Sequence, residues 1–472
     1  MASFNERAQA SMPEKTAGDL VDEDARDVDD DDEYTPAEQR KIIHKVDRRL
    51  LPVLGLMQAV SFLDRANMSN ASVAGMTKEL GLGIGHRYSI VLLVFFAPYV
   101  LLQFPASILV RRVGPRLFLS SIVLAWGIVM MCFGFVQNWK SLIPVRMLLG
   151  AFEAGCFPGQ YYLISSWYTR YDLYKRISIF YLIGVLGSAL GGVLGLGFSQ
   201  MSGLAGYLGW RWLFIMEGLL TCLIGALGYI FTVDFPGTAH KAWGFLTERE
   251  AACIVRRINR DRQDADPERF SLRNFLAPAG DFKIWLFALM FLCSTMQAYA
   301  VGNFLPLILM GEMGFSQTKT QGLTTPPYLA AMVLMYVEGW LSDKFRLRAP
   351  VMYFNALLCI MGLCLMSWGP TAGVQYFGAI CLTAGCSAII PTLMVYQSNN
   401  IRGTWQRAFS SASLISFGGT GGIVGSLVFR SHANAIILIL ATALTVYFIA
   451  QNRRAEAGLV VLEDLPGFRY AL

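Results

Sequence analysis

Two segments of this chain place charged side chains within otherwise apolar stretches. The first contains Asp64 and Arg65, and the second contains Arg146, Gly150 and Glu153. The spacing of the second set, i, i+4 and i+7, puts all three on one face of a helix, with about 10 Å of rise between the charged pair. A guanidinium binds a carboxylate bidentately, and a partly buried carboxyl group can take up and release protons near neutral pH. These residues therefore predict anion binding combined with proton transfer.

The composition indicates that these charges lie in a membrane protein. The chain has 472 residues, of which 54% are hydrophobic and only 15% charged, and its mean hydropathy is +0.46. An ordinary soluble domain carries roughly 25% charged residues. Basic residues stand singly between apolar runs, which disfavours a nucleic-acid-binding protein. The nine cysteines include no CxxC pair, which argues against a metal, redox or disulfide framework.

Apolar stretches long enough to span a membrane recur along the chain. A hydrocarbon core about 30 Å thick requires roughly 20 apolar residues in a helix. Twelve such stretches are predicted at 51–72, 88–110, 116–137, 141–168, 177–199, 210–232, 283–310, 324–342, 349–369, 373–396, 408–429 and 434–451. We therefore predict an all-α membrane protein with twelve transmembrane helices in two pseudo-symmetric six-helix bundles.

The polar segments between and around these stretches divide the chain. We expect a disordered acidic tail at 1–45, because residues 1–39 hold thirteen Asp and Glu against three Lys and Arg and little apolar surface. The N-terminal bundle then covers 46–234, a connector 235–282, the C-terminal bundle 283–452 and a second tail 453–472. The predicted inner loops hold eleven Lys and Arg and the outer loops six. By the positive-inside rule, both termini and the connector are cytoplasmic.

An internal repeat supports the two-bundle plan. The loop 107–116 and the loop 339–348 stand at equivalent places, 232 residues apart, in the two halves. Both carry a small residue followed by a basic cluster, which indicates a duplicated unit, and two halves related in this way usually enclose a site at mid-membrane. The chemically notable residues of these loops are Arg111, Arg112, Arg116, Gly339, Asp343, Lys344, Arg346 and Arg348.

The second of these loops resembles a known family. It matches the Gly-x-x-x-Asp-[Arg/Lys]-x-x-[Arg/Lys]-[Arg/Lys] motif of the major facilitator superfamily at its Gly, Asp and basic positions. The first loop departs from the motif, with Ser107 and Arg111 in place of Gly and Asp. The resemblance implies that these loops latch the cytoplasmic helix ends in the outward-open state. Because the first loop has no carboxylate, this implication does not extend fully to the N-terminal latch. Positive-inside anchoring alone is the alternative interpretation of both loops.

The membrane-embedded charges carry a finer resemblance. The segments Leu63-Asp64-Arg65-x-Asn67 and Arg146-x-x-x-Gly150-x-x-Glu153-Ala-Gly155-x-x-Pro158 are similar to motifs of the anion:cation symporter family, in particular its fungal allantoate permease-like branch. This similarity implies that Asp64 and Glu153 are linked to protons. It further implies that Arg65 and Arg146 contact an anionic substrate or balance charge.

Other polar residues inside the spans could contribute to substrate binding. Hydrogen bonding between helices, or ordinary packing, would equally explain them. These candidates are Asn67, Tyr99 and Gln103 in the first half, and Gln297, Tyr299, Asn303, Tyr396 and Asn400 in the second.

We therefore predict a secondary active transporter of a small organic anion, of carboxylate, vitamin or ureide type. It imports the anion with protons across the plasma membrane, works as a monomer, and uses no cofactor, metal or nucleic acid. It is not an enzyme, because all four histidines lie outside the spans and no nucleotide loop is present. Export of an anionic metabolite, or nutrient sensing without transport, remains an alternative.

Overall fold

The computed structural model describes residues 34–169, 172–262, 271–311, 317–345, 348–401, 403–427, 432–457, 460–462 and 469–470, and every regular element in these ranges is helical. The long helices of the first half are α2 (Pro36–Ala71), α4 (Arg87–Val113), α5 (Pro115–Phe133), α6 (Trp139–Glu153), α7 (Cys156–Trp167), α8 (Leu173–Ser199) and α9 (Gly209–Phe231). Those of the second half are α12 (Phe282–Gly311), α13 (Gln317–Phe345), α14 (Ala349–Trp368), α15 (Ala372–Asn400), α16 (Thr404–Leu427) and α17 (His432–Glu456).

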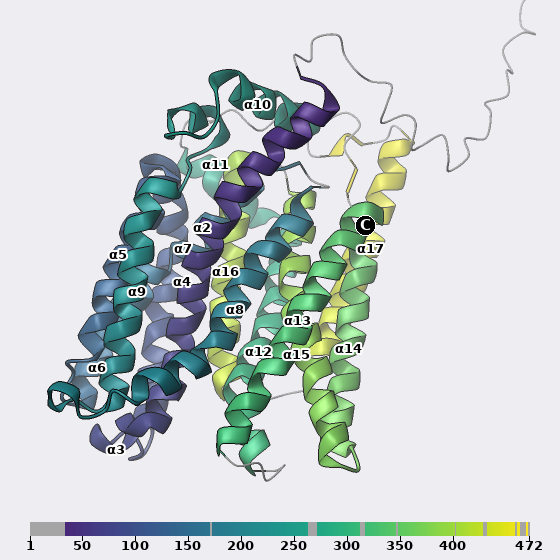
Figure 1. Ribbon diagram of the computed structural model, residues 1–472. Coiled ribbons are helices and arrows are strands. Elements are labelled where there is room, and N and C mark those ends of the chain that lie inside the picture. Colours follow the sequence, from purple (N-terminus) through teal and green to yellow (C-terminus); the bar gives the residue numbers. More distant parts are fainter. Residues whose placement is uncertain are drawn as a thin grey trace, which may run out of the picture.

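Shorter elements join these helices. They are η1 (Ser72–Met76), α3 (Thr77–Glu79), η2 (Leu204–Gly206), η3 (Pro236–Lys241), α10 (Glu248–Arg262), α11 (Leu272–Leu276) and η4 (Ala277–Gly280). The stretch predicted as one span at 141–168 consists of α6 and α7, which are separated at Ala154 and Gly155. With these two counted together, the long helices of the described ranges correspond to the twelve predicted spans (Figure 1).

The first helix begins earlier than the sequence predicts. Thr35 and Glu38 form a capping box: the Thr35 backbone N–H donates to Glu38 Oε2 (2.9 Å), and the Glu38 N–H donates to Thr35 Oγ1 (3.4 Å). Pro36 occupies the first helical position, where its missing N–H costs nothing. Residues 36–45, part of the predicted disordered tail, are therefore helical. Residues 1–33 lie outside the described ranges.

Small residues let the helices of each half approach closely. A Cβ on Gly187 of α8 would lie 2.2 Å from the carbonyl oxygen of Ala59 on α2. In the second half, a Cβ on Gly425 of α16 would lie 2.2 Å from the carbonyl oxygen of Met296 on α12. Only glycine permits these contacts, so Gly187 and Gly425 lie on packing faces of their helices.

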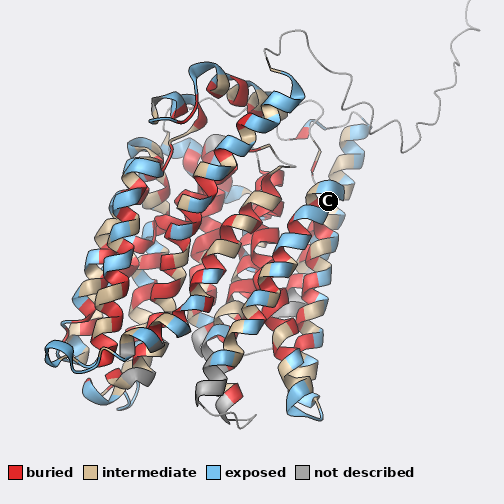
Figure 2. Cartoon of the chain, in the orientation of Figure 1, coloured by how far each residue is buried: buried red, intermediate tan, exposed pale blue. Residues whose placement is uncertain are grey.

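The outer surface of the bundle suits a lipid environment. Seven helices of the described ranges are long and apolar enough to cross a membrane on length and composition. Large hydrophobic side chains point outward around the bundle, for example Leu101, Val193 and Val333. Figure 2 shows exposed positions on the outer helix faces and buried positions between the helices. The chain thus forms a multi-pass helical membrane protein.

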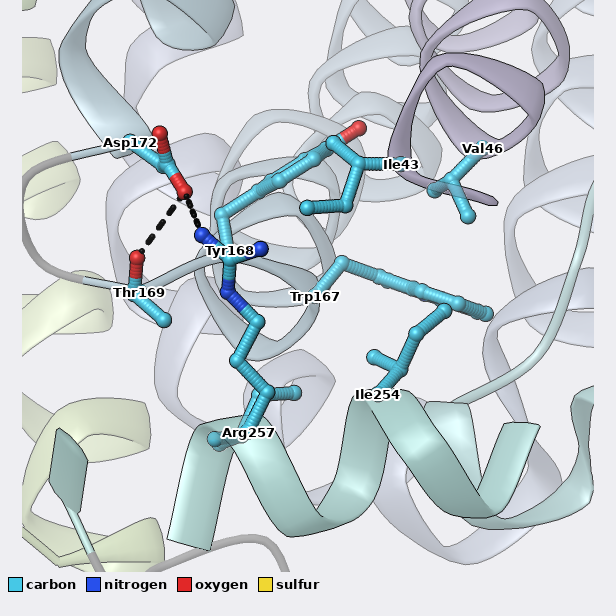
Figure 3. Close-up of a pocket in the computed structure, with 9 residues that line it drawn as sticks. Ile43, Val46, Trp167, Tyr168, Thr169, Asp172, Ile254 and Arg257 are labelled. Atoms are coloured by element: carbon cyan, nitrogen blue, oxygen red, sulfur yellow. Dashed lines mark hydrogen bonds and ion pairs between the residues drawn. The ribbon is translucent and has the colours of Figure 1, made fainter. Parts of the chain in front are cut away.

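The polar segment between the halves caps one end of the bundle. Figure 1 shows α10 and α11 at the same end as the start of α2 and the end of α17, and we call this end the connector face. The helix α10 begins with a second capping box, in which the Thr247 N–H donates to Glu250 Oε2 (2.7 Å). Lys45 of α2 reaches the same carboxylate at 3.1 Å. Arg257 of α10 donates to Asp172 Oδ2 before α8 (2.7 Å), beside a crevice that also involves Trp167 (Figure 3).

The two halves meet along α4 with α16 and α8 with α13. Near the connector face, the Tyr161 hydroxyl of α7 donates to the carbonyl oxygen of Met394 on α15. Arg407 of α16 donates to the carbonyl oxygen of Ser165 on α7 (2.6 Å). The halves are therefore bonded together at the connector face.

Candidate functional site

Arg65 is the centre of a polar cluster that joins both halves. Its Nε and Nη2 donate to Glu153 Oε1 of α6, at 2.9 and 2.5 Å. Glu153 is only 2% exposed, and Ser61, one turn before Arg65 on α2, donates its hydroxyl to the same oxygen (2.5 Å). A buried ion pair of this kind is stable only when hydrogen bonds complete its geometry, as they do here.

Two tyrosines complete the shell around the guanidinium. Arg65 Nη2 donates to the Tyr99 hydroxyl of α4 (3.1 Å), and Nη1 donates to the Tyr299 hydroxyl of α12. Because α12 belongs to the second half, this one side chain connects the two halves.

Aromatic rings form the walls of this cluster. The Arg65 guanidinium carbon lies 5.0 Å from the Tyr99 ring centroid and 5.9 Å from that of Phe95. Phe95 stacks on Tyr99 (5.3 Å between centroids), and Phe96 packs edge-on against Tyr299 (5.8 Å). A cation among ring faces is favoured electrostatically.

Arg146 does not pair with the glutamate on its own helix. The sequence places Arg146 and Glu153 on one helix face, and both side chains are indeed buried. Glu153 nevertheless pairs with Arg65, while Arg146 lies between the rings of Phe95 (5.7 Å) and Phe133 (5.6 Å). Its Nε has no hydrogen-bond partner in the described part of the chain. Arg146 is therefore a buried cation with an unused donor.

Asp64 is buried in the interior of the first half. Trp126 of α5 donates its indole N–H to Asp64 Oδ2 (3.1 Å), and Oδ1 has no partner among the described residues. Asn67, one turn later on α2, is fully buried, and neither polar atom of its side chain is bonded within those residues. Asp64 and Arg65 thus have different partners, although they are adjacent in sequence.

Three other predicted binding residues lie on α4 and α12. Gln103 accepts a hydrogen bond from Ser416 of α16 (3.2 Å), so it lies at the interface of the halves. Gln297 of α12 accepts a bond from the Cys386 thiol (3.3 Å), and its Nε2 is without a partner in the described ranges. The backbone of Asn303 belongs to α12, but its side chain lies outside what the structure describes.

Two of the predicted binding residues lie away from Arg65. The Tyr396 ring packs between Phe287 of α12 (5.2 Å) and Phe448 of α17 (5.9 Å), inside the second half. Asn400 is buried at the end of α15, where its Nδ2 donates to the carbonyl oxygen of Tyr396 (2.8 Å). The structure does not bring these two residues to the cluster, because the interior of the second half surrounds them.

The predicted latch of the second half joins the two halves. Asp343 Oδ2 accepts the backbone N–H of Lys175 in the first turn of α8 (2.8 Å), where the helix dipole favours a negative charge. Arg348 is fully buried and donates to Asp343 Oδ1 (2.7 Å). A Cβ on Gly339 would lie 2.9 Å from Ser178 Oγ, so glycine allows α13 to approach α8. Arg346 lies outside the described residues.

The first-half loop makes a different contact at the equivalent position. Arg111, which replaces the aspartate of the motif, stacks over the Trp405 ring of α16 at 3.8 Å. Arg116 is directed elsewhere, with its Nε donating to the Tyr229 carbonyl oxygen (2.6 Å). The remaining basic residues of the two loops are Arg112, at the end of α4, and Lys344, whose Nζ lies 5.0 Å from the Trp340 ring. A cation–π contact thus stands where the motif predicts a carboxylate.

Comparison with known proteins identifies the family. Residues 54–426 match the model of the Major Facilitator Superfamily. The chain belongs to this superfamily. Among curated proteins, it is 30% identical over 442 residues to the major facilitator-type transporter hxnP of Emericella nidulans, covering 89% of this chain and 87% of the relative. It is 28% identical over 409 residues to the high-affinity nicotinic acid transporter of Saccharomyces cerevisiae, covering 86% of this chain and 75% of that protein.

Solved structures of the superfamily share this fold. The proton:xylose symporter XylE aligns with a TM-score of 0.66 at 14% identity, covering 86% of this chain and 95% of that one. The human organic anion transporter MFSD10 aligns with a TM-score of 0.58 at 14% identity, covering 85% and 99%. The predicted major facilitator fold is therefore confirmed, and the chain is a membrane transporter of this superfamily.

Three residues near this transporter's charged cluster were not predicted from the sequence. Ser61 and Trp126 bond to Glu153 and Asp64 respectively, but nothing in their sequence surroundings singles them out. Glu217 is different, because it is the single Asp or Glu in the apolar stretch that forms α9. An isolated acid at membrane depth is the signal that would have identified it.

Proposed function

We propose that this protein is a proton-coupled symporter that imports a small organic anion, with the connector face in the cytoplasm of a cell whose plasma membrane it spans. The observation that carries the proposal is the buried Arg65–Glu153 pair, which joins a cation to a titratable group at the interface of the two halves. Charged groups at such depth are costly, and transporters use them for substrate and proton binding.

Coupling follows from competition for one guanidinium. With Glu153 ionised, both of its bonds from Arg65 are formed and the cation is neutralised. Protonation of Glu153 removes that charge and releases Arg65 to bind a substrate carboxylate. Anion and proton thus enter the site together, because either one alone would leave a buried charge uncompensated.

The surroundings of Arg65 support a flat aromatic monocarboxylate as the substrate class. Arg65 supplies a planar fork that matches a carboxylate, while Phe95, Tyr99 and Tyr299 supply rings and hydroxyl groups beside it. The yeast relative is a nicotinic acid transporter, and nicotinic acid belongs to this class. Nicotinate is therefore the first compound to test.

The cycle also uses the contacts at the connector face. The Asp343–Lys175 bond and the Arg111–Trp405 stack hold that face closed while the substrate binds from the other side. Rocking of the halves then breaks these contacts and the Arg65–Tyr299 bond. Loss of the proton from Glu153 restores its pair with Arg65 and expels the anion inward.

The decisive experiment is uptake of labelled nicotinate and of its neutral analogue nicotinamide into cells that express the protein. Uptake at pH of about 5 should exceed uptake at about 7.5 and should fall with a protonophore. Nicotinamide should not accumulate, because it has no carboxylate for Arg65. Expression of Glu153→Gln should abolish proton-driven accumulation, whereas Glu248→Gln, on the exposed start of α10, should leave it unchanged. Accumulation by Glu153→Gln at the wild-type level contradicts the coupling assignment.

A further inference from the structure

Glu217 is a buried acid for which the described structure offers no partner. It lies in the first half of α9, its side chain is 0% exposed, and neither carboxyl oxygen has a hydrogen-bond partner among the described residues. Thr221, one turn later, donates to the backbone carbonyl oxygen of Glu217 (2.9 Å) and not to its side chain. An ionised carboxylate in such surroundings would lose its hydration without compensation.

Another carboxyl group lies close enough for its charge to act on Glu217. Among the titratable groups of the described ranges, Asp64 of α2 is the one whose charge acts on Glu217. Trp126 of α5 fixes one oxygen of Asp64 at 3.1 Å. The helices α5 and α9 are in close contact beside Glu217, since a Cβ on Gly218 would lie 2.7 Å from the backbone nitrogen of Met131. The two acids therefore share a tightly packed interior.

Charge balance in this interior requires a proton. Among the described residues, the charges of Glu153, Arg146 and Arg65 act on Asp64. Within the described residues, this cluster combines two guanidinium groups with three carboxyl groups, the third being Glu217. With one carboxyl protonated, the cluster is neutral. The acid without hydrogen bonds is the one for which protonation removes the largest desolvation cost.

We propose that Glu217 and Asp64 form a second proton-binding site of the transport cycle, separate from Glu153, and that Glu217 carries the proton in the state with the connector face closed. This inference rests on the proposed function. Asp64 and Arg65 are consecutive on α2, so a rotation of α2 that turns Arg65 toward a substrate also moves Asp64 relative to Glu217. Substrate binding at Arg65 thereby changes the surroundings of the proton on Glu217.

Infrared difference spectroscopy tests the proton site without any substrate. Purified protein in lipid at pH of about 7.5 should show the C=O stretching band of a protonated carboxyl group, which shifts in D2O. The band should be lost in Glu217→Gln. Thr221→Ala, a matched change on the same helix, should keep it. A wild-type spectrum without the band, or an unchanged band in Glu217→Gln, overturns the proposal.

Transport measurements test the role in the cycle. In proteoliposomes, Glu217→Gln should still exchange labelled nicotinate across the membrane but should lose accumulation driven by a pH gradient. A merely structural role would reduce both processes together, and wild-type accumulation would also exclude the role in the cycle. If no variant moves nicotinate, the proposed function fails for this probe, while the infrared result still decides whether Glu217 holds a proton.

Discussion

Gly150 sets the distance between the helices that carry the charged cluster, and its replacement by alanine has a calculable effect. A Cβ at this position would lie 2.2 Å from the carbonyl oxygen of Phe95 on α4. Real Cβ atoms essentially never come within 3.0 Å of such an atom, so α6 and α4 must separate by the difference, about 0.8 Å. The obstacle is backbone, which cannot turn aside as a flexible side chain would.

The displacement also affects the Arg65–Glu153 pair. Glu153 is three residues beyond Gly150 on α6, and its oxygen is held at 2.5 Å by both Ser61 and Arg65. Overpacking of a well-packed interior costs about 1–3 kcal/mol, and weakening a bond to a charged group adds part of the about 1.5–3 kcal/mol that such a bond contributes. We therefore expect Gly150→Ala to lose at least about 1 kcal/mol of stability and to take up substrate more slowly.

Thermal melting of the detergent-solubilised protein measures the first effect. Gly197→Ala is the matched control, because a Cβ at Gly197 on α8 would meet no atom within 4 Å. That control should melt at or slightly above the wild type, since alanine favours a helix over glycine by up to about 1 kcal/mol. A Gly150→Ala protein that melts with the control, and transports like it, would refute the packing argument.

The remaining predictions concern the cluster, the latch and the connector. Arg65→Lys keeps the charge, but an ammonium with three N–H donors cannot reproduce the four hydrogen bonds of the planar guanidinium, so nicotinate uptake should fall at least about tenfold, in initial-rate assays. Tyr299→Phe should weaken uptake more than Tyr353→Phe, whose lost bond to Thr442 lies outside the cluster; equal rates would argue against a role for Tyr299. Asp343→Asn should broaden spin-label distances between α8 and α13, because the charge at the start of α8 is lost; unchanged distances would rule out a latch. Burial alone would raise the pKa of Glu250, but the Thr247 N–H and Lys45 lower it below its ordinary 4.5. This depressed pKa stabilises the α2–α10 contact above about pH 4.5, and the stabilisation is lost as the pH falls further. Glu250→Gln should abolish this pH dependence of hydrogen exchange in α10, and its persistence would exclude Glu250 as the source.

Much of the fold could be predicted from local features of the sequence. Hydropathy over about 20 residues identifies a span where the helix is apolar along its own length, as seven helices of the described ranges are. The spacing of Arg146, Gly150 and Glu153 correctly placed all three in the interior, since helical periodicity depends only on sequence. The start of α2 was misplaced because the polar residues 36–45 show no hydropathy signal, although Thr35 and Glu38 do form the capping pattern.

Partners, in contrast, depend on how helices pack, and only the tertiary structure decided them. The sequence alone determined that Glu153 and two arginines lie at membrane depth, because position along an apolar helix is a local property. That Glu153 pairs with Arg65 and not with Arg146 depends on the rotation of α2 against α6. For the same reason, only the tertiary structure shows that Tyr396 packs against α17 and that Arg111 stacks on the ring of Trp405. Helix rotation and approach arise from contacts between residues far apart in sequence, and no short motif encodes them.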